Sequence, residues 1–341
     1  MAFYFNRHFQ TQPLPCMISF IMQVYLRLIR LPLLPSTLGN ICLGALSAGI
    51  SQAGISQADF ISFILLLLSS AFLYSSGMAW NDYFDAKIDA VERPERPLPS
   101  GSISPKNAST FAFMLMVTGI AIAFVAEFLR DFSGWSIPIT LLISFFVLAY
   151  DAGGKNFFFG PVLMGACRFF NVLLGWSVVT QPSIGFFDLF DGWSLLMYPF
   201  PAIAFLQAGI VGVYIAGVTW FAKNEANQSN RTSLVLASCI IIVALLTSLS
   251  TPGINQSGTP PPLMFPYLFF LLIVRIGKRL FNAIKDPSPK NVQGTVVTCL
   301  KSLVLLDCIL TIGVAGWVGL WILILLVPNF IINRFKNFYT T

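Results

Sequence analysis

Amide and carboxylate side chains gather in one short stretch, residues 81–89 (NDYFDAKID). Asp82, Asp85 and Asp89 stand at positions i, i+3 and i+7, and Asn81 precedes Asp85 by four residues. On a helix these spacings place the side chains on one face, where like charges repel each other. A divalent cation removes that repulsion, and Mg²⁺ prefers hard oxygen ligands and usually binds substrate phosphate as well. The cluster predicts a Mg²⁺ site for a phosphorylated substrate; the alternative is a solvated helix end.

Two arginines follow this acidic cluster within residues 93–101 (RPERPLPSG). Arg93 and Arg96 lie four and seven residues beyond Asp89. Guanidinium groups suit two-point binding of phosphate, and the three prolines stiffen the segment and prevent a simple helix. Carboxylates for a metal beside guanidiniums for phosphate together predict a diphosphate site.

The composition shows what kind of molecule must hold this site. The chain has 341 residues, of which 56% are hydrophobic and 10% charged, whereas soluble domains carry roughly 25% charged residues. A soluble globular enzyme is therefore excluded. We assign the net charge of +6 to loops on the cytoplasmic side of a membrane rather than to nucleic-acid binding. Scattered cysteines and a single histidine, His8, argue against zinc and disulfide frameworks. The N-terminus shows no convincing signal peptide.

Nine apolar runs are long enough to predict transmembrane helices in an all-α membrane protein. The last contains Gly313, Gly316 and Gly319, so we expect it to be tilted, kinked or split. Gly209, Gly212 and Gly217 predict close helix packing. The runs are 33–51, 60–80, 109–129, 134–150, 158–180, 198–222, 232–250, 261–281 and 303–329.

The basic residues orient these spans. With the N-terminus inside, most of the Lys and Arg fall on the inner side, while residues 52–59, 181–197 and 251–260 contain none. The tail, with Arg334 and Lys336, is the exception: either nine spans leave it outside, or the last run is a hairpin. We expect a multi-pass protein of a bacterial inner membrane or its equivalent, with the acidic cluster at the cytoplasmic face.

The acidic cluster also carries a family resemblance. NDYFDAKID resembles the NDxxDxxxD motif of the UbiA superfamily of membrane prenyltransferases, and RPERPLPSGSIS (93–104) is similar to the stretch that follows it in that family. Arg30-Leu31-Pro32, Asn40, Tyr150 and Lys155 are further similarities. Residues 165–175 (GACRFFNVLLG) and 213–226 (VYIAGVTWFAKNEA) resemble UbiA-type proteins encoded in ebo gene clusters.

This resemblance implies a helical bundle with a central polar cavity, spanning residues 33–332, between an N-terminal cytoplasmic or interfacial segment (1–32) and a tail (333–341). It implies transfer of a polyprenyl group from its diphosphate to an acceptor, with Mg²⁺. The implied metal ligands are Asp82, Asp85, Asp89 and Glu225. The implied diphosphate-binding residues are Asn40, Asn81, Arg93, Arg96, Lys155 and Arg168. The implied catalytic residues are Tyr150, Asp151 and Lys155.

Several assignments stay open at this level. Family members carry a second acidic motif, but residues 218–229 hold one carboxylate, Glu225, beside Lys223. Either Glu225 completes a weaker second metal site, or one metal suffices, or the chain no longer performs the reaction and is a transporter or lipid-handling protein. Asp151 either orients Lys155, acts as a base, or faces water. Asp307 is expected to snorkel or pair near the inner interface. The acceptor cannot be read.

Overall fold

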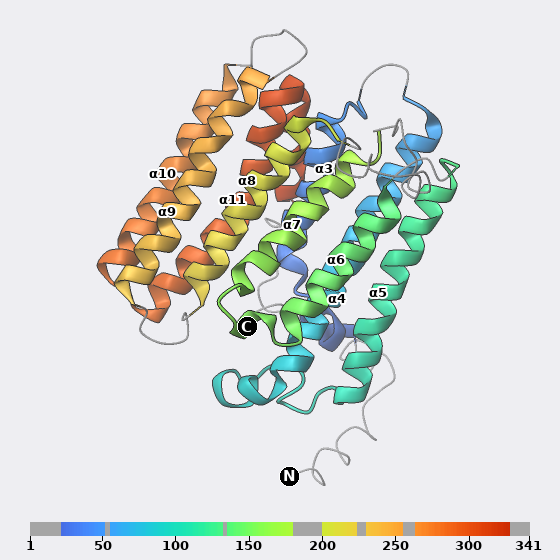
Figure 1. The fold of residues 1–341 in the computed structure, drawn as a ribbon. Coiled ribbons are helices and arrows are strands. Elements are labelled where there is room, and N and C mark those ends of the chain that lie inside the picture. The colour runs from blue at the N-terminus through green and yellow to red at the C-terminus, as the bar shows by residue number, and fades with distance from the viewer. Residues whose placement is uncertain are drawn as a thin grey trace.

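The computed structural model describes residues 22–51, 55–131, 135–179, 200–223, 230–254 and 263–327. Within these ranges the chain forms helices and no strands, which confirms the all-α prediction (Figure 1). The longer helices are α3 (Pro35–Ser47), α4 (Gln57–Glu92), α5 (Pro105–Phe128), α6 (Ser136–Asp151), α7 (Gly160–Trp176), α8 (Ala202–Ala222), α9 (Arg231–Thr247), α10 (Met264–Lys285) and α11 (Pro289–Ala315). Short 3₁₀ helices join or extend them: η2 (Leu31–Leu33), η3 (Gly154–Asn156), η6 (Ser248–Ile254) and η7 (Gly316–Leu326).

Helix α4 carries the acidic cluster. Its first turn is capped by Ser56, whose hydroxyl accepts a hydrogen bond from the Asp59 amide at 3.0 Å. It ends at Glu92, just before Arg93-Pro94, because the residue before a proline avoids helical geometry. The helix therefore continues well beyond the predicted span 60–80, and the cluster forms its last turns.

Helix α3 approaches two neighbours closely enough to require glycine. A Cβ added at Gly175 of α7 falls 2.9 Å from the Ile41 Cα, and one added at Gly44 falls 2.7 Å from the Gly175 carbonyl carbon. On its other side, a Cβ at Gly39 falls 2.5 Å from Asp307 Oδ2 of α11. These contacts fix α3 between α7 and α11, as small residues do in membrane helix pairs.

The predicted small-residue contacts of α8 are confirmed at two of three positions. A Cβ at Gly212 falls 3.1 Å from the Gly165 carbonyl oxygen, and one at Gly217 falls 2.8 Å from Ile241 Cγ1. At Gly209 the described residues show no such contact, since none of their atoms lies within 4 Å of that position.

All nine predicted runs fall on helices of the described chain, but the count of nine membrane spans is not confirmed. Five helices are long and apolar enough to cross a bilayer, or six if the bent pair Met22–Leu28 and Leu31–Ser47 is counted as one span. Helices α6 and α7 are short, and every 18-residue window of α10 includes Arg275, Lys278 and Arg279.

The last apolar run is split, as its glycines predict. Helix α11 ends at Ala315, and Gly316 adopts φ +70°, a backbone conformation that favours glycine. A Cβ at Gly319 of η7 falls 3.0 Å from the Cys308 carbonyl oxygen and 2.7 Å from the Ile312 nitrogen. Segment η7 therefore turns back and packs along α11.

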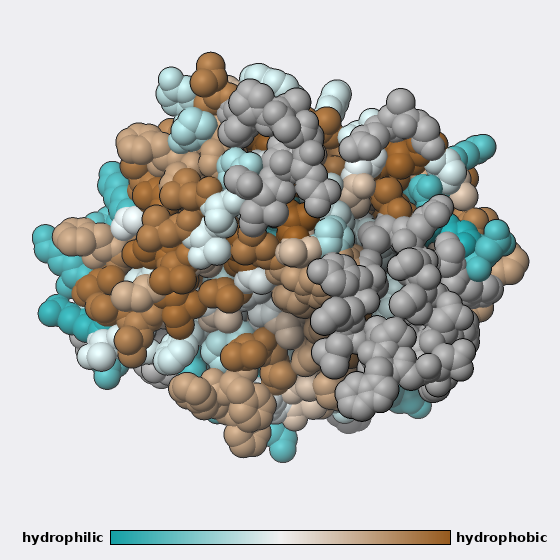
Figure 2. Space-filling view, turned by 45° about the horizontal axis from the view of Figure 1, so that its top comes forward, coloured by the Kyte–Doolittle hydropathy of each residue, from teal (hydrophilic) through white to brown (hydrophobic). Residues whose placement is uncertain are grey.

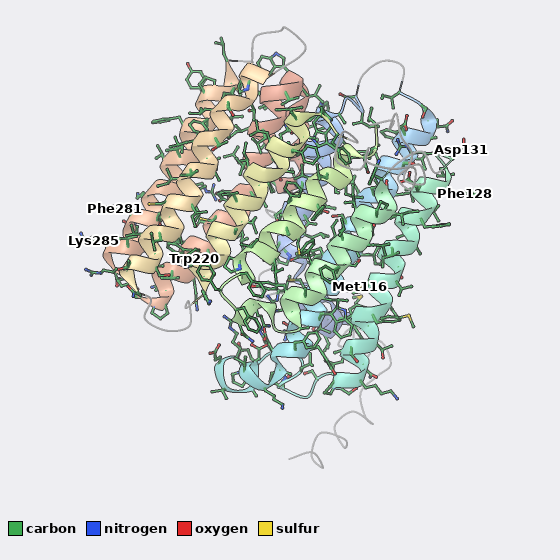
Figure 3. The ribbon with its side chains drawn as sticks, in the orientation of Figure 1. Met116, Phe128, Asp131, Trp220, Phe281 and Lys285 are labelled. Carbon is green, nitrogen blue, oxygen red and sulfur yellow. The ribbon has the colours of Figure 1, made fainter. Side chains whose placement is uncertain are left out.

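The outer surface of the bundle is apolar. Figure 2 shows hydrophobic residues spread across the visible face, with hydrophilic residues gathered toward its edges. On α10, Phe270 and Leu271 are exposed. Phe281 is 67% exposed, and it and Lys285 point away from the bundle at the end of that helix (Figure 3). Such an extended apolar surface matches a lipid environment.

Candidate active site

A cavity of about 460 Å³ lies among α3, α4, α6, α7, α8 and α11, beside the end of α4 that carries the acidic cluster. Among the described residues, its wall contains one carboxylate, Asp151. Five basic side chains of the described residues also line it, and they come from segments far apart in the sequence: Arg30, Arg93, Lys155, Arg168 and Lys223. This excess of positive charge suits an anionic ligand, while the rest of the wall is largely apolar.

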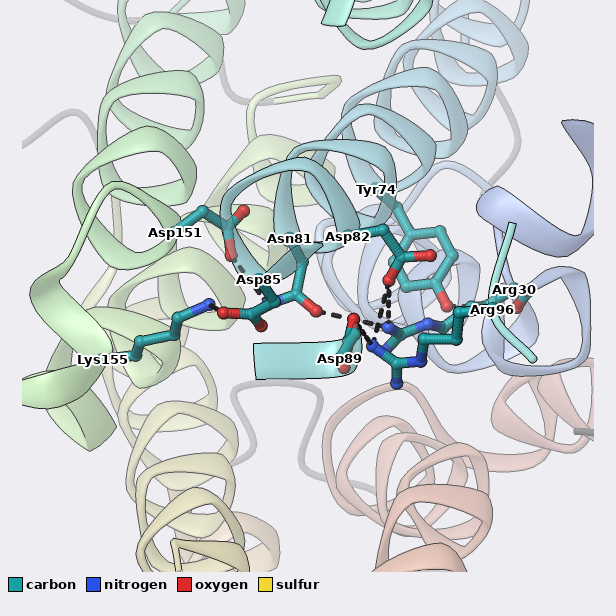
Figure 4. A network of polar contacts seen from close by, with 9 residues as sticks. All are labelled: Arg30, Tyr74, Asn81, Asp82, Asp85, Asp89, Arg96, Asp151 and Lys155. Carbon is teal, nitrogen blue, oxygen red and sulfur yellow. Dashed lines mark hydrogen bonds and ion pairs between the residues drawn. The ribbon is translucent and has the colours of Figure 1, made fainter. Parts of the chain in front are cut away.

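Two carboxylates of the cluster pair with arginines on one side of α4. Asp82 and Asp89 are each only 3% exposed. Arg30 Nη2 lies 2.5 Å from Asp82 Oδ1, and Arg96 Nη1 lies 2.6 Å from Asp89 Oδ2 and 3.3 Å from Asp82 Oδ1 (Figure 4). Arg96 thus bridges two turns of the helix and holds the loop after α4 against it.

The third carboxylate, Asp85, pairs with Lys155 of η3 on the other side (Figure 4). Asn81 links the two sides, because its Oδ1 accepts a hydrogen bond from Arg30 at 3.2 Å and its Nδ2 donates one to Asp151 at 3.2 Å. Asn81, Lys155 and Asp151 all line the cavity. The structure therefore brings seven predicted site residues together at the end of α4. Asn81, Asp82, Asp89, Arg96 and Asp151 are linked with Arg30 by hydrogen bonds, and Asp85 and Lys155 form a pair beside them.

Asp151 follows the predicted span 134–150 and is the last residue of α6. Its side chain is buried, and burial raises its pKa to about 7, although the hydrogen bond from Asn81 and the charge of Lys155 act in the opposite direction. A carboxyl group with such a pKa can accept a proton near neutrality.

The donor set of the cluster fits magnesium in its chemistry. It offers only hard oxygen ligands, and each carboxylate already faces a positive charge. As they stand, no three acidic, histidine or cysteine side chains in the described ranges converge on one point. A bound diphosphate offers the basic side chains another anion, and Asp82, Asp85 and Asp89 are then the residues that would hold the metal.

Deeper in the bundle, a second polar group joins α3, α7 and α11. Arg168 Nη1 lies 2.6 Å from Thr37 Oγ1 and 3.3 Å from Asn40 Oδ1. Asn40 Nδ2 donates to both carboxylate oxygens of Asp307 at 3.0 Å. Asn40 and Asp307 are 0% exposed and are not among the residues that line the cavity, so Asn40 does not reach the cavity surface as the sequence suggested.

Of the remaining predicted residues, two line the cavity and one lies outside the residues that the structure describes. Tyr150 and Arg93 line the cavity. Glu225 lies outside the described residues. Sequence reasoning missed Arg30 and Lys223 as cavity residues. Arg30 has a left-handed φ of +46°, and its carbonyl accepts a hydrogen bond from Tyr74 Oη at 3.2 Å. The sequence carries no signal for either feature beyond the family-like Arg30-Leu31-Pro32.

Comparisons with known proteins agree with this geometry. A model described as the UbiA prenyltransferase family matches residues 41–291. A protein named digeranylgeranylglyceryl phosphate synthase from Methanothrix thermoacetophila is 32% identical over 221 residues, which cover 62% of this chain and 75% of that protein. One of the same name from Methanobrevibacter smithii is 40% identical over 90 residues, covering 26% of this chain and only 31% of the relative.

Solved structures match the fold. One, described as giving insights into digeranylgeranylglyceryl phosphate synthase in membranes, has a TM-score of 0.56 at 18% identity and covers 87% of this chain and 99% of its own. Another, a UbiA homolog from Archaeoglobus fulgidus bound to DMAPP and Mg²⁺, has a TM-score of 0.53 at 15% identity and covers 84% and 98%. With an acidic helix end, a basic cavity and a family match over most of its length, this multi-pass membrane chain belongs to the UbiA prenyltransferase family.

Proposed function

We propose that the protein transfers a polyprenyl group from its diphosphate to a small-molecule acceptor, with Mg²⁺ held by Asp82, Asp85 and Asp89. The observation that carries this proposal is the juxtaposition of those three carboxylates with a cavity lined by five basic side chains. Lysine and arginine groups bind diphosphate oxygens, and the apolar part of the wall suits an isoprenoid chain.

The side chains around the cluster have distinct roles in this reaction. Arg30, Arg93 and Lys155 neutralise charge on the departing diphosphate, while bound Mg²⁺ supplies Lewis-acid stabilisation of the same leaving group. Arg96 holds Asp82 and Asp89 in place, and Asn81 joins Arg30 to Asp151. Asp151 is positioned to take the proton that the acceptor loses when its new bond forms.

The donor and acceptor follow from chemistry and from the relatives' names. Digeranylgeranylglyceryl phosphate carries two geranylgeranyl groups, so geranylgeranyl diphosphate and geranylgeranylglyceryl phosphate are the first substrates to test. Aromatic acceptors are the second choice. We place the site at the cytoplasmic membrane face, since the basic residues of the loops gather at that end of the bundle.

The test is Mg²⁺-dependent release of pyrophosphate from geranylgeranyl diphosphate by the purified protein, with each acceptor. Asp85→Asn should lower the rate by about 100-fold or more, because Lys155 and the metal lose their shared ligand. The matched control is Asp286→Asn, an exposed carboxylate after α10 that bonds Ser288 and Asn291. Equal activity of Asp85→Asn and Asp286→Asn would contradict the proposal. Binding of the diphosphate without release, with every acceptor, would favour the transporter or lipid-handling alternative.

A further inference from the structure

Arg168 is a cation at a different depth from the diphosphate site. It lies eight residues into α7, about 12 Å along the helix axis from Gly160. Its hydrogen bonds go to Ser36, Thr37 and Asn40 of α3. None goes to the acidic cluster, whose partners are Arg30, Arg96 and Lys155. Arg168 thus lines the same cavity but stands apart from the basic side chains that pair with the acidic cluster.

The guanidinium of Arg168 is held by neutral oxygen atoms. In the described part of the chain, no carboxylate lies within ion-pair distance of it, and its acceptors are two hydroxyl groups and the Asn40 amide oxygen. Among the described residues, three of the five guanidinium N–H groups have an acceptor, and the other two have none there and can serve a ligand. Arg168 is only partly buried although it lies deep in the bundle, because it lines the cavity.

Asp307 balances the charge of Arg168 from behind. Asn40 accepts a hydrogen bond from Arg168 through Oδ1 and donates through Nδ2 to Asp307. This arrangement keeps the carboxylate away from the cavity while it fixes the orientation of the amide and of the guanidinium. A charged residue within a membrane helix is costly to retain, and one that faces a cavity marks a ligand site.

We propose that Arg168 binds an oxyanion of the acceptor, a phosphate or a carboxylate, while the donor diphosphate occupies the acidic cluster. The apolar part of the cavity wall, which includes Leu73, Ile143 and Met164, suits the hydrocarbon part of the same molecule. This inference rests on the proposed transferase function and adds the residue that recognises the charged group of the acceptor. It reassigns Arg168 from the diphosphate to the acceptor.

The test compares matched charged and neutral acceptors by calorimetric binding to the purified protein. Geranylgeranylglyceryl phosphate is compared with geranylgeranylglycerol, and 4-hydroxybenzoate with 4-hydroxybenzyl alcohol; the two pairs distinguish a phosphate from a carboxylate. We expect the unaltered protein to prefer the charged member of at least one pair by about 10- to 100-fold. Arg168→Gln should abolish this preference, and Arg168→Lys should retain part of it.

Three controls keep the outcomes separate. Arg130→Gln removes another buried arginine, one that bonds Asp59 and the Ser177 carbonyl away from the cavity, and should leave the preference unchanged. Binding of geranylgeranyl thiodiphosphate with Mg²⁺ should change less than twofold in Arg168→Gln. Asp85→Asn should weaken binding of that analogue and leave the oxyanion preference intact.

Equal or absent binding of charged and neutral acceptors by the unaltered protein would overturn the inference. A preference for the charged acceptor that persists in Arg168→Gln would also overturn it. Equal loss of binding of all ligands in both Arg168 variants would overturn it too, because that result would assign Arg168 a structural role. An unaltered protein that keeps the oxyanion preference but shows no Mg²⁺-dependent binding of the diphosphate analogue would instead contradict the proposed function.

Discussion

Each carboxylate of the acidic cluster is matched by a basic side chain. Arg30 and Arg96 neutralise Asp82, Arg96 neutralises Asp89, and Lys155 neutralises Asp85. Removing one partner of such a pair leaves the other with an uncompensated charge, which is costly when that group is buried. A ligand that supplies both a cation and an anion preserves the balance, whereas a metal alone does not.

This balance predicts that metal and diphosphate bind together. Mg²⁺ alone should bind weakly, because it competes with three basic side chains for the carboxylates. Addition of geranylgeranyl thiodiphosphate should increase the apparent Mg²⁺ affinity by about 10-fold or more, equivalent to at least ~1.4 kcal/mol. Isothermal titration with and without the analogue measures this. An Mg²⁺ affinity that is unaffected by the analogue would contradict the expectation.

Asp151 predicts a pH dependence. Because burial raises its pKa to about 7, the carboxyl group is protonated below that pH and cannot accept a proton. We expect the transfer rate at saturating substrates to fall as pH decreases through about 7. Asp151→Asn should be slower at neutral pH and should lack this limb of the profile, whereas Asp286→Asn should keep it. An unchanged profile in Asp151→Asn would restrict Asp151 to orienting Asn81.

At the scale of elements, the contact between α3 and α7 depends on paired glycines. Gly175→Ala should place its Cβ against the backbone of Ile41 and destabilise the protein by about 1–3 kcal/mol. Gly277→Ala on α10 is the control, since no atom of the described residues lies within 4 Å of that position, and it should be neutral or stabilising by up to ~1 kcal/mol. Thermal unfolding in detergent compares the two; a Gly175→Ala midpoint at or above that of Gly277→Ala would refute the contact.

The elements also show which parts of the site the sequence could predict. The face shared by Asp82, Asp85 and Asp89 follows from helical spacing, a local property. Their partners do not follow, because Arg30 and Lys155 reach them from 52 and 70 residues away through tertiary packing.

Residues within the spans were harder to assign. The sequence indicated that Arg168 faces a polar cavity, and the structure confirms that position. It expected Asp307 to snorkel or to pair, and the structure shows it 0% exposed and bonded to Asn40. The identity of that partner could not be predicted, because it depends on which neighbouring helix packs against α11.

At the scale of the molecule, the orientation in the membrane can be tested directly. With the N-terminus inside, residue 57 at the start of α4 lies outside and residue 285 at the end of α10 lies inside. Gln57→Cys should react with a membrane-impermeant thiol reagent in intact cells, and Lys285→Cys only after permeabilisation, each relative to the parent protein with its native cysteines. The reverse pattern would invert the topology.

The bond between Asn40 and Asp307 joins residues 267 positions apart, and it has a consequence for synthesis. The ribosome completes the acidic cluster early, but Arg168 must wait for α11 before Asp307 supplies its counter-charge. Until α11 is inserted, the nascent chain carries an uncompensated arginine in the membrane. Asp307 in turn must enter the membrane beside Asn40 and Arg168, which are already in place. The cavity is therefore complete only after α11 has been inserted. We expect chains truncated before α11 to be recognised by membrane quality control.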